Sequence, residues 1–403
     1  MSRGNDAYDA IVVGARCAGA PTAMLLARQG HRVLLLDRST FPSDTLSTLV
    51  VQPHGVAALA RWGLLDDVKA TGCPPIEQYT FDFGPVVISG RPRPADGNAV
   101  AFAPRRTVLD KLLVDAAVAA GVEVREAFTV DDLVVDDGVV VGVRGHPDDG
   151  PGVVEHARVV IGADGHNSRV ARAVHAERYH DKPVLESAFY TFWHDLAVDG
   201  LTTLVRGDRG FAAIPTNDDL TLLLVGCPFA QAADFRRDVE ANYFGALARE
   251  PEWADRVAAA TRADRFIGGG VPNFFRKPYG RGWILVGDAG YTKDPITAQG
   301  IANAFIDAER VATALGEVWT GGRSFDDALG HYQTERDATA LPMYEFTTQL
   351  ATLEPPPPEM ERLIAAMAGN QPAMDAFVSV SAGTMSPTEF FDPSHLCQLL
   401  AGR

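Results

Sequence analysis

Three segments of this chain are rich in glycine and aspartate, each follows a short apolar run, and they lie far apart in the sequence. The segments are residues 14–37, 164–172 and 287–308. In the first, an apolar strand at 8–14 passes through a tight turn into a helix expected at 19–30, and a second strand then ends at Asp37. This order predicts a βαβ unit with an acid at its end. If the three segments form one site, the domains must be interleaved along the chain rather than successive.

The turn of the βαβ unit determines what it can bind. A helix N-terminus offers unpaired N–H groups and a positive dipole end to a pyrophosphate, and an acid after the second strand accepts hydrogen bonds from a ribose diol. The turn departs from the G-x-G-x-x-G pattern because Arg16 occupies the middle glycine position between Gly14 and Gly19. We expect slightly displaced phosphates, with Arg16 supplying a charge instead. Taken alone, this segment fits an ordinary tight turn equally well.

The other two segments repeat the pattern of a strand that ends in a turn. The second ends in Asp164 and Gly165 and then breaks into a helix. The third is a strand at 283–286 followed by Gly287 and Asp288 and, past a proline, by a long helix. Together the three segments predict one FAD site.

With these segments, the chain resembles the flavoprotein monooxygenases of the para-hydroxybenzoate hydroxylase type, whose relatives include the geranylgeranyl reductases and flavin-dependent halogenases. The resemblance covers most of residues 8–320 and is far more specific for FAD than for the reaction, because one scaffold hosts several chemistries. It implies an α/β fold in which a Rossmann-like FAD-binding domain of the glutathione-reductase type is interleaved with a β-sheet substrate domain and followed by a helical C-terminal cap. The expected FAD-binding domain is 6–75, 98–180 and 265–320, the substrate domain is 76–97 and 181–264, and the cap is 321–403.

The resemblance also implies cofactor contacts in this chain. Those expected around the ADP half are Gly14, Ala15, Arg16, Ala18, Gly19, Asp37 and Arg38, with Arg106 as a further FAD-contacting arginine. Asp164 and Gly165 would lie where the pyrophosphate and a pyridine nucleotide meet. Those expected around the flavin half are Ser47, Thr48, Gly287, Asp288, Pro295, Gly300 and Ile301. Asp288 would hold a ribityl hydroxyl, Pro295 would line the ring, and the helix from Gly300 would direct its N–H groups at the flavin N1 and C2 carbonyl edge.

The middle of the chain is expected to select the substrate. Strands of an antiparallel sheet are predicted at 185–196, 210–215 and 220–227. The candidate substrate residues are Phe189, Tyr190, Trp193, Phe211 and Pro215. If Phe189 and Trp193 face the flavin, the pocket suits a planar or lipophilic substrate. Alternatively, these aromatic residues fill the interface between the sheet and the core.

The resemblance implies a reaction in which the cofactor does the chemistry. NADH or NADPH, a transient co-substrate, would reduce FAD, and a flavin hydroperoxide would transfer oxygen to a small substrate. A geranylgeranyl-reductase-like double-bond reductase is the alternative. A halogenase is disfavoured because the W-x-W-x-I-P pattern is replaced by the sequence at 210–215, which lacks both tryptophans. A flavin-binding protein without turnover is the hypothesis from another class.

Composition narrows the possible partners. The formal net charge of −16 disfavours nucleic acid or an anionic membrane. The sequence has no apolar run of about 18 residues, so we expect neither a transmembrane segment nor a secretion signal. The cysteines are Cys17, Cys73, Cys227 and Cys397. Because they are isolated in the sequence, we expect no metal site and no disulfide framework, and a cytoplasmic location. The small-molecule substrate and the oligomeric state are not specified by the sequence.

Overall fold

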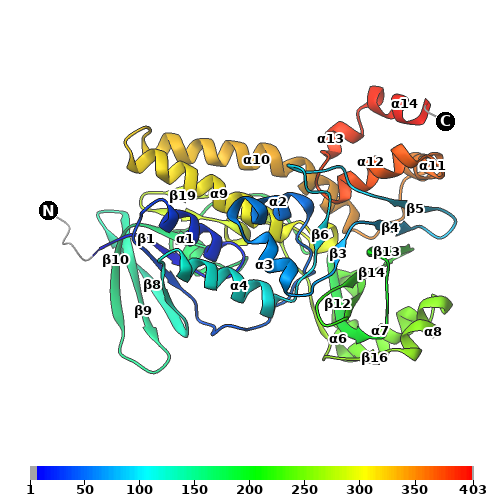
Figure 1. The fold of residues 1–403 in the computed structure, drawn as a ribbon, viewed down its shortest axis with the longest axis horizontal. Coiled ribbons are helices and arrows are strands. Elements are labelled where there is room, and N and C mark those ends of the chain that lie inside the picture. The colour runs from blue at the N-terminus through cyan, green and yellow to red at the C-terminus, as the bar shows by residue number, and fades with distance from the viewer. Residues whose placement is uncertain (1–6, 402–403) are drawn as a thin grey trace.

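Two large sheets organise the fold, and in the computed structural model they lie at opposite ends of the molecule, with helices packed against both (Figure 1). The structure describes residues 7–401. Within that range each large sheet has eight strands, and two smaller sheets have three and two. The predicted α/β architecture with a helical C-terminal region is confirmed. Residues 6, 402 and 403, which the expected domain bounds include, lie outside the described range.

The first sheet carries the three glycine-containing segments. Its strands are β1 (Tyr8–Val13), β2 (Val33–Leu36), β7 (Glu123–Arg125), β8 (Phe128–Asp136), β9 (Val139–Pro147), β10 (Val153–Gly162), β19 (Tyr279–Gly280) and β20 (Trp283–Leu285). The order is β19-β20-β10-β1-β2-β7, and β9 joins β8 to β10. Parallel pairing places Val13 beside Gly162, which in turn lies beside Leu285. All three segments therefore leave the sheet at the same edge.

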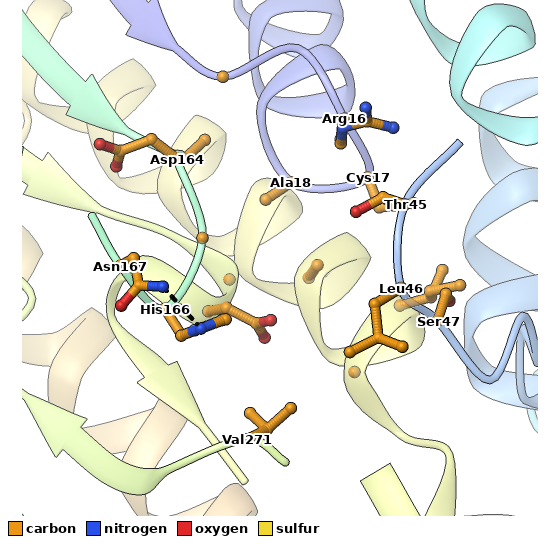
Figure 2. Close-up of a pocket in the computed structure, with 18 of the residues that line it drawn as sticks. Arg16, Cys17, Ala18, Thr45, Leu46, Ser47, Asp164, His166, Asn167 and Val271 are labelled. Atoms are coloured by element: carbon orange, nitrogen blue, oxygen red, sulfur yellow. Dashed lines mark hydrogen bonds between the residues drawn. The ribbon is translucent and has the colours of Figure 1, made fainter. Parts of the chain in front are cut away.

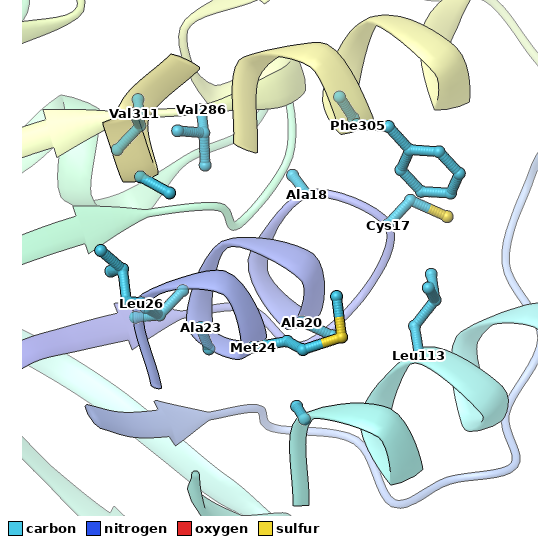
Figure 3. Close-up of a cluster of buried hydrophobic side chains, with 14 of the residues drawn as sticks. Cys17, Ala18, Ala20, Ala23, Met24, Leu26, Leu113, Val286, Phe305 and Val311 are labelled. Carbon is cyan, nitrogen blue, oxygen red and sulfur yellow. The ribbon is translucent and has the colours of Figure 1, made fainter. Parts of the chain in front are cut away.

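Three helices bury the inner face of this sheet. They are α1 (Gly19–Arg28), α4 (Arg106–Ala119) and α9 (Gly300–Trp319). Figure 3 shows α1 between the other two, with Met24 near Leu113 of α4 and Ala18 near α9. Ala20, Ala23 and Met24 have no exposed surface. The small side chains of α1 let it lie close to the strands, and each large buried side chain contributes roughly 1.5–3 kcal/mol.

The second sheet is largely antiparallel. Its strands are β4 (Tyr79–Asp82), β5 (Val87–Gly90), β12 (Glu186–His194), β13 (Leu201–Arg206), β14 (Arg209–Pro215), β15 (Thr221–Pro228), β16 (Thr261–Arg262) and β17 (Ile267–Gly269). The order is β16-β12-β15-β14-β13-β4-β5, with β17 also paired to β12. Its outer face is covered by α6 (Ala232–Arg237), α7 (Val239–Leu247) and α8 (Pro251–Ala259). β17 belongs to this sheet, although residues from 265 onward are expected in the FAD-binding domain.

Shorter elements complete the fold between and beside these sheets. They are α2 (Pro53–Trp62), α3 (Leu65–Ala70), α5 (Arg169–Ala173), β3 (Pro75–Ile76), β6 (Ala101–Phe102), β11 (Arg178–Lys182), β18 (Asn273–Arg276), β21 (Tyr291–Thr292), and the 3₁₀ turns η1 (Phe229–Gln231), η2 (Gly287–Ala289) and η3 (Pro295–Thr297). The turn η2 packs against α9, and η3 leads into it.

The C-terminal region is helical. Its helices are α10 (Phe325–Leu350), α11 (Pro358–Met367), α12 (Gln371–Ser381), α13 (Pro387–Phe390) and α14 (Pro393–Ala401). The long α10 runs along α9, and α12 packs on β5 of the second sheet (Figure 1). Among the helices of residues 7–401, none has the length and apolar character needed to cross a membrane.

Candidate active site

A cavity of about 760 Å³ opens where the three segments leave the first sheet. Its walls come from both large sheets, because Gly14 and Asp37 line one side and Ala188 and Leu224 line another. The volume falls within the roughly 300–1,000 Å³ that is usual for ligand sites. In open parallel sheets, ligands bind at this same edge, outside the carboxyl ends of the strands.

The three segments touch one another at this edge, close to Ala18 and Asp164 in Figure 2. A Cβ atom on Gly14 would lie 2.4 Å from the carbonyl oxygen of Ala163, so the first segment packs directly on the second. A Cβ atom on Gly287 would lie 2.8 Å from the Cβ of Ala18, so the third packs on the first. Gly14 (φ 102°) and Gly287 (φ 56°) also have left-handed backbone conformations. The segments meet closely because both positions are glycine.

Most of the predicted cofactor contacts line this one cavity. They are Gly14, Arg16, Ala18, Asp37, Arg38, Ser47, Thr48, Arg106, Asp164, Gly165, Gly287, Asp288, Pro295, Gly300 and Ile301. Two of the predicted residues, Ala15 and Gly19, lie behind its wall instead. The amide of Ala15 donates to the Asp37 carboxylate (2.7 Å), and a Cβ atom on Gly19 would lie 1.7 Å from the Gly14 carbonyl oxygen. These two residues shape the turn, and the contacts of all the others with a cofactor stay predictions.

Arg16 is bound to a buried carboxylate. Its guanidinium donates to Asp110 of α4 (2.5 Å) and to the hydroxyl of Ser43 in the loop after β2 (2.9 Å). Arg106 donates two further hydrogen bonds of 3.0 Å to Asp110, which has no exposed surface. The arginine at the middle glycine position therefore ties the βα turn to α4 and to the loop at 43–44. Its side chain also lines the cavity, so the charge expected there is present but already paired.

The residues present fit an FAD molecule. No side chain caps the first turn of α1 or α9, which leaves N–H groups of both helices available to phosphate and carbonyl oxygens. A Cβ atom on Gly300 would meet nothing within 4 Å, so α9 begins at open space. The buried Oδ1 of Asp164 has no hydrogen-bond partner within residues 7–401. A buried acceptor of this kind is satisfied when a ligand hydroxyl donates to it.

A group of ionisable side chains lies at the wall of the cavity formed by η2, β21 and α9, and Lys293 and Asp307 are buried there. Burial lowers the pKa of Lys293 to about 7, although the carboxylates of Asp288 and Asp307 act in the opposite direction. Burial raises the pKa of Asp307 to about 6, whereas Asp288 is exposed to the cavity. His54 of α2 has its pKa lowered to about 4 by burial and by Lys293, so it is neutral at pH 7. In the described chain, no group of three or more His, Cys, Asp or Glu residues could hold a metal ion.

A pair of carboxyl groups lies beside the cavity. Glu186 of β12 and Asp294, just before η3, are buried neighbours. Burial raises the pKa of both groups. Glu186 Oε2 and Asp294 Oδ2 have no hydrogen-bond partner within residues 7–401. A single proton held between the two carboxyl groups would satisfy both oxygens.

The predicted substrate residues divide between two faces of the second sheet. Those that do not line the cavity are Phe189, Trp193, Phe211 and Pro215. Side chains alternate along a strand, so Ala188 and Tyr190 of β12 face the cavity while Phe189 and Trp193 pack under the outer helices. Phe189 and Trp193 therefore do not line the cavity, and their packing agrees with the alternative in which they fill the core. Phe211 fills the same outer core.

Tyr190 places a hydroxyl at the wall of the cavity that the second sheet forms. Its hydroxyl accepts a hydrogen bond from the Ser47 amide (3.2 Å), and its own proton has no acceptor within the described residues. Burial raises the pKa of Tyr190, which therefore stays protonated at neutral pH. Leu46 lies beside Ser47, and Val271 lines the cavity apart from them (Figure 2). The Tyr190 hydroxyl can donate one hydrogen bond to a ligand in the cavity.

Several residues of the site were not found from the sequence. They are Asp110, Ala188, Leu224, Lys293, Asp294 and Asp307. The spacing of Arg106 and Asp110, which is i,i+4, could have indicated their pairing on a helix. Lys293 and Asp307 gave no such signal, because a single charged residue in a sequence does not reveal its burial.

Comparison with known proteins identifies relatives over most of the chain. A family model described as "FAD binding domain" matches residues 7–347. Protein FixC of Bradyrhizobium diazoefficiens is 27% identical over 78% of this chain and 77% of its own length. Digeranylgeranylglycerophospholipid reductase of Methanocella arvoryzae is 27% identical over 81% of this chain and 82% of its own. Rifampicin monooxygenase of Streptomyces venezuelae is 26% identical over 89% of this chain and 75% of its own length.

Solved structures share the fold at lower identity. The myxobacterial chondrochloren halogenase CndH has a TM-score of 0.81 at 24% identity and covers 98% of this chain and 96% of its own. PqsL of Pseudomonas aeruginosa, in complex with 2-aminobenzoylacetate, has a TM-score of 0.73 at 23% identity. The match covers 86% of this chain and 96% of the PqsL chain. At this level of identity, the likeness shows the fold alone.

Proposed function

Because this chain belongs to the FAD binding domain family, we propose that it is a monooxygenase that consumes NADH or NADPH and oxygenates a small aromatic or lipophilic substrate. Membership of the family makes it an FAD-dependent oxidoreductase. The observation that carries the proposal is a cavity that extends from the edge where the three segments converge, its polar end, to a wall with Leu46, Leu224, Val271 and the Tyr190 hydroxyl, its apolar end. The interleaved domains predicted from the sequence are part of the proposal, with the second sheet as the substrate domain.

At the polar end, the chain binds and orients the cofactor. The N-terminus of α1 offers N–H groups to the pyrophosphate, and Asp37 is positioned by the Ala15 amide to accept hydrogen bonds from ribose hydroxyls. The N-terminus of α9 favours negative charge on the group that lies against it. The chemistry that bound FAD supplies is electron transfer from the reduced nicotinamide and the activation of oxygen.

At the apolar end, the chain positions the substrate and excludes water. Leu46, Leu224 and Val271 supply an apolar wall, and a dry cavity protects reactive species from side reactions. The Tyr190 hydroxyl, anchored by the Ser47 amide, donates to a phenol or carbonyl oxygen of the substrate. We infer that a substrate has one such oxygen and is otherwise apolar.

Oxidation of NADH and NADPH tests the proposal. Purified FAD-loaded protein is assayed with a panel of phenols, polyketides and prenylated lipids, and a substrate should accelerate nicotinamide oxidation under air. Product formed under ¹⁸O₂ should carry one labelled oxygen atom. Nicotinamide oxidation that no compound accelerates would support a flavin-binding protein without turnover instead.

Substitution of Tyr190 tests the substrate end. Tyr190→Phe removes the donor and should raise KM about tenfold, which corresponds to the loss of one hydrogen bond of roughly 1.4 kcal/mol. Tyr279→Phe is the matched control, because Tyr279 is half-buried and lies outside the cavity. An unchanged KM in Tyr190→Phe would contradict the assignment.

A double-bond reductase is the second candidate, favoured by the similarity to digeranylgeranylglycerophospholipid reductase. The two candidates differ in their need for oxygen. Reduced product that forms from a prenylated lipid under anaerobic conditions, with no labelled oxygen under ¹⁸O₂, would establish the reductase in place of the monooxygenase.

A further inference from the structure

Lys293 is a buried lysine at the wall of the cavity. Its side chain is only 8% exposed, and it follows β21 two residues before Pro295. The ammonium donates to the Tyr291 hydroxyl (2.8 Å), its one hydrogen bond within residues 7–401. An ammonium group carries three N–H donors, so two remain without a protein acceptor. Burying unpaired donors costs free energy, and a ligand in the cavity can supply the missing acceptors.

The charges around Lys293 show that the protein does not neutralise it by direct pairing. Asp288 of η2 and Asp307 of α9 are near enough to favour its charged form, but neither forms an ion pair with it. His54 of α2 is close enough to interact with Lys293 and is neutral at pH 7. The hydrogen-bond partner Tyr291 is also neutral, because burial raises its pKa well above the ordinary value.

The arginines that line the same cavity near α4 differ from Lys293 in this respect. Arg16 and Arg106 both direct their guanidinium groups at Asp110, and their hydrogen bonds are used within the protein. Lys293 instead adjoins the part of the wall formed by Asp288, Pro295 and the start of α9. That part is the one assigned above to the ribityl and ring portion of the cofactor.

We propose that Lys293 is a cofactor-contacting residue that donates hydrogen bonds to the ribityl–isoalloxazine half of FAD and stabilises negative charge there. The inference rests on the proposed FAD site but not on the substrate or on oxygen chemistry. Binding of an acceptor favours the ammonium form of Lys293, so the protein takes up a proton when FAD binds at a pH above the pKa of the unliganded lysine, which burial lowers to about 7. Binding of the ADP half of FAD, which is assigned to residues 14–37, is not affected.

The test compares the two halves of the cofactor. Apoprotein is titrated calorimetrically with FAD, riboflavin and ADP, for the wild type and for Lys293→Met. Lys277→Met is the control, because Lys277 is an exposed lysine outside the cavity. We expect Lys293→Met to weaken FAD and riboflavin at least tenfold and to leave ADP unchanged. With FAD bound, Lys293→Met should have a lower midpoint potential than the wild type. The potential should fall by about 30 mV for each tenfold loss in the preference of the site for reduced over oxidised FAD.

Unchanged riboflavin affinity and potential, or equal losses for ADP and riboflavin, would overturn the proposal. If Lys293→Met does not fold, the wild type alone decides. FAD titrations at pH 8 in two buffers of different ionisation enthalpy should reveal proton uptake, and its absence would count against Lys293. None of these measurements requires a substrate, so a failure here leaves the proposed monooxygenation untouched. Equally, failure to find oxygenation would leave the binding results standing.

Discussion

Replacement of Asp110 by asparagine should reveal how strongly the buried charges hold the βα turn. Asp110 has no exposed surface and accepts hydrogen bonds from Arg16 (2.5 Å) and twice from Arg106 (3.0 Å). Asparagine has nearly the same volume as aspartate, but it presents an NH₂ group to one guanidinium. It also deprives both guanidinium groups of the negatively charged partner. Removing one partner of a buried ion pair costs about 3–5 kcal/mol. We expect the lower end, about 3 kcal/mol, because the side chain of Arg16 is 23% exposed and water can solvate part of it.

The matched control lies one turn further along the same helix. Asp115 pairs with Lys111 (2.6 Å), but both side chains are largely exposed, at 58% and 40%. Exposed pairs at this spacing contribute about 0.3–0.5 kcal/mol, so Asp115→Asn should have almost no effect. The comparison separates burial of the carboxylate from its position on α4.

Urea unfolding of the apoproteins measures both effects, with the midpoint and slope compared between variants. FAD affinity should also fall in Asp110→Asn, because Arg16 and Arg106 line the cavity and lose the carboxylate that orients them. A free energy of unfolding within 1 kcal/mol of the wild type, or equal to that of Asp115→Asn, would refute the reasoning.

Two further substitutions test other parts of the site. Gly300→Val places a side chain in the open space at the start of α9, so FAD should bind at least tenfold more weakly while apoprotein stability changes by less than about 1 kcal/mol. Gly245→Val, which also meets open space but lies in α7, is its control, and equal FAD affinity in the two variants would contradict the prediction. Glu186→Gln replaces the shared proton by a permanent donor to Asp294. Burial raises the pKa of both carboxyl groups, so their contribution to the free energy of unfolding is complete below about pH 4, where the unfolded carboxyls are also protonated. This contribution is lost as the pH rises through the raised pKa values. At pH 8 the variant should therefore be more stable by about 1 kcal/mol, and its unfolding midpoint should fall less between pH 4 and 8. The exposed Glu354→Gln should show neither change, and a Glu186→Gln curve parallel to the wild type would disprove the shared proton.

The convergence of the three segments on one cavity was predictable because its signals are local. The apolar strand, the glycine turn and the helix at 19–30 each follow from neighbouring residues, and the structure forms β1, α1 and β2 there. The carboxyl ends of parallel strands share an edge, so three such segments converge without any knowledge of the rest of the chain. The long helix expected near Gly300 begins at that residue.

The face of β12 was not predictable because both faces are buried. Its residues from Glu186 to Trp193 are all buried, so the polar alternation that marks an outer face is absent. Alternation still places Phe189 and Tyr190 on opposite faces, but it does not indicate which one meets the cofactor. The partner of Arg16 is equally hidden from the sequence, because Asp110 lies 94 residues away and becomes a neighbour only when α4 packs against α1.

The two ends of the cavity therefore respond differently to mutation. At the βα turn, Arg16 replaces a small glycine and is held by Asp110, so the geometry of the proposed phosphate site depends on a buried ion-pair cluster that also stabilises the fold. Beside α9, a side chain at Gly300 would meet open space, and Lys293 has N–H donors without a protein acceptor. The fold therefore depends little on contacts made by this part of the wall. Substitutions at the turn should change stability and FAD affinity together. Substitutions beside α9 should change the affinity for the flavin half and its potential while unfolding of the apoprotein stays nearly constant.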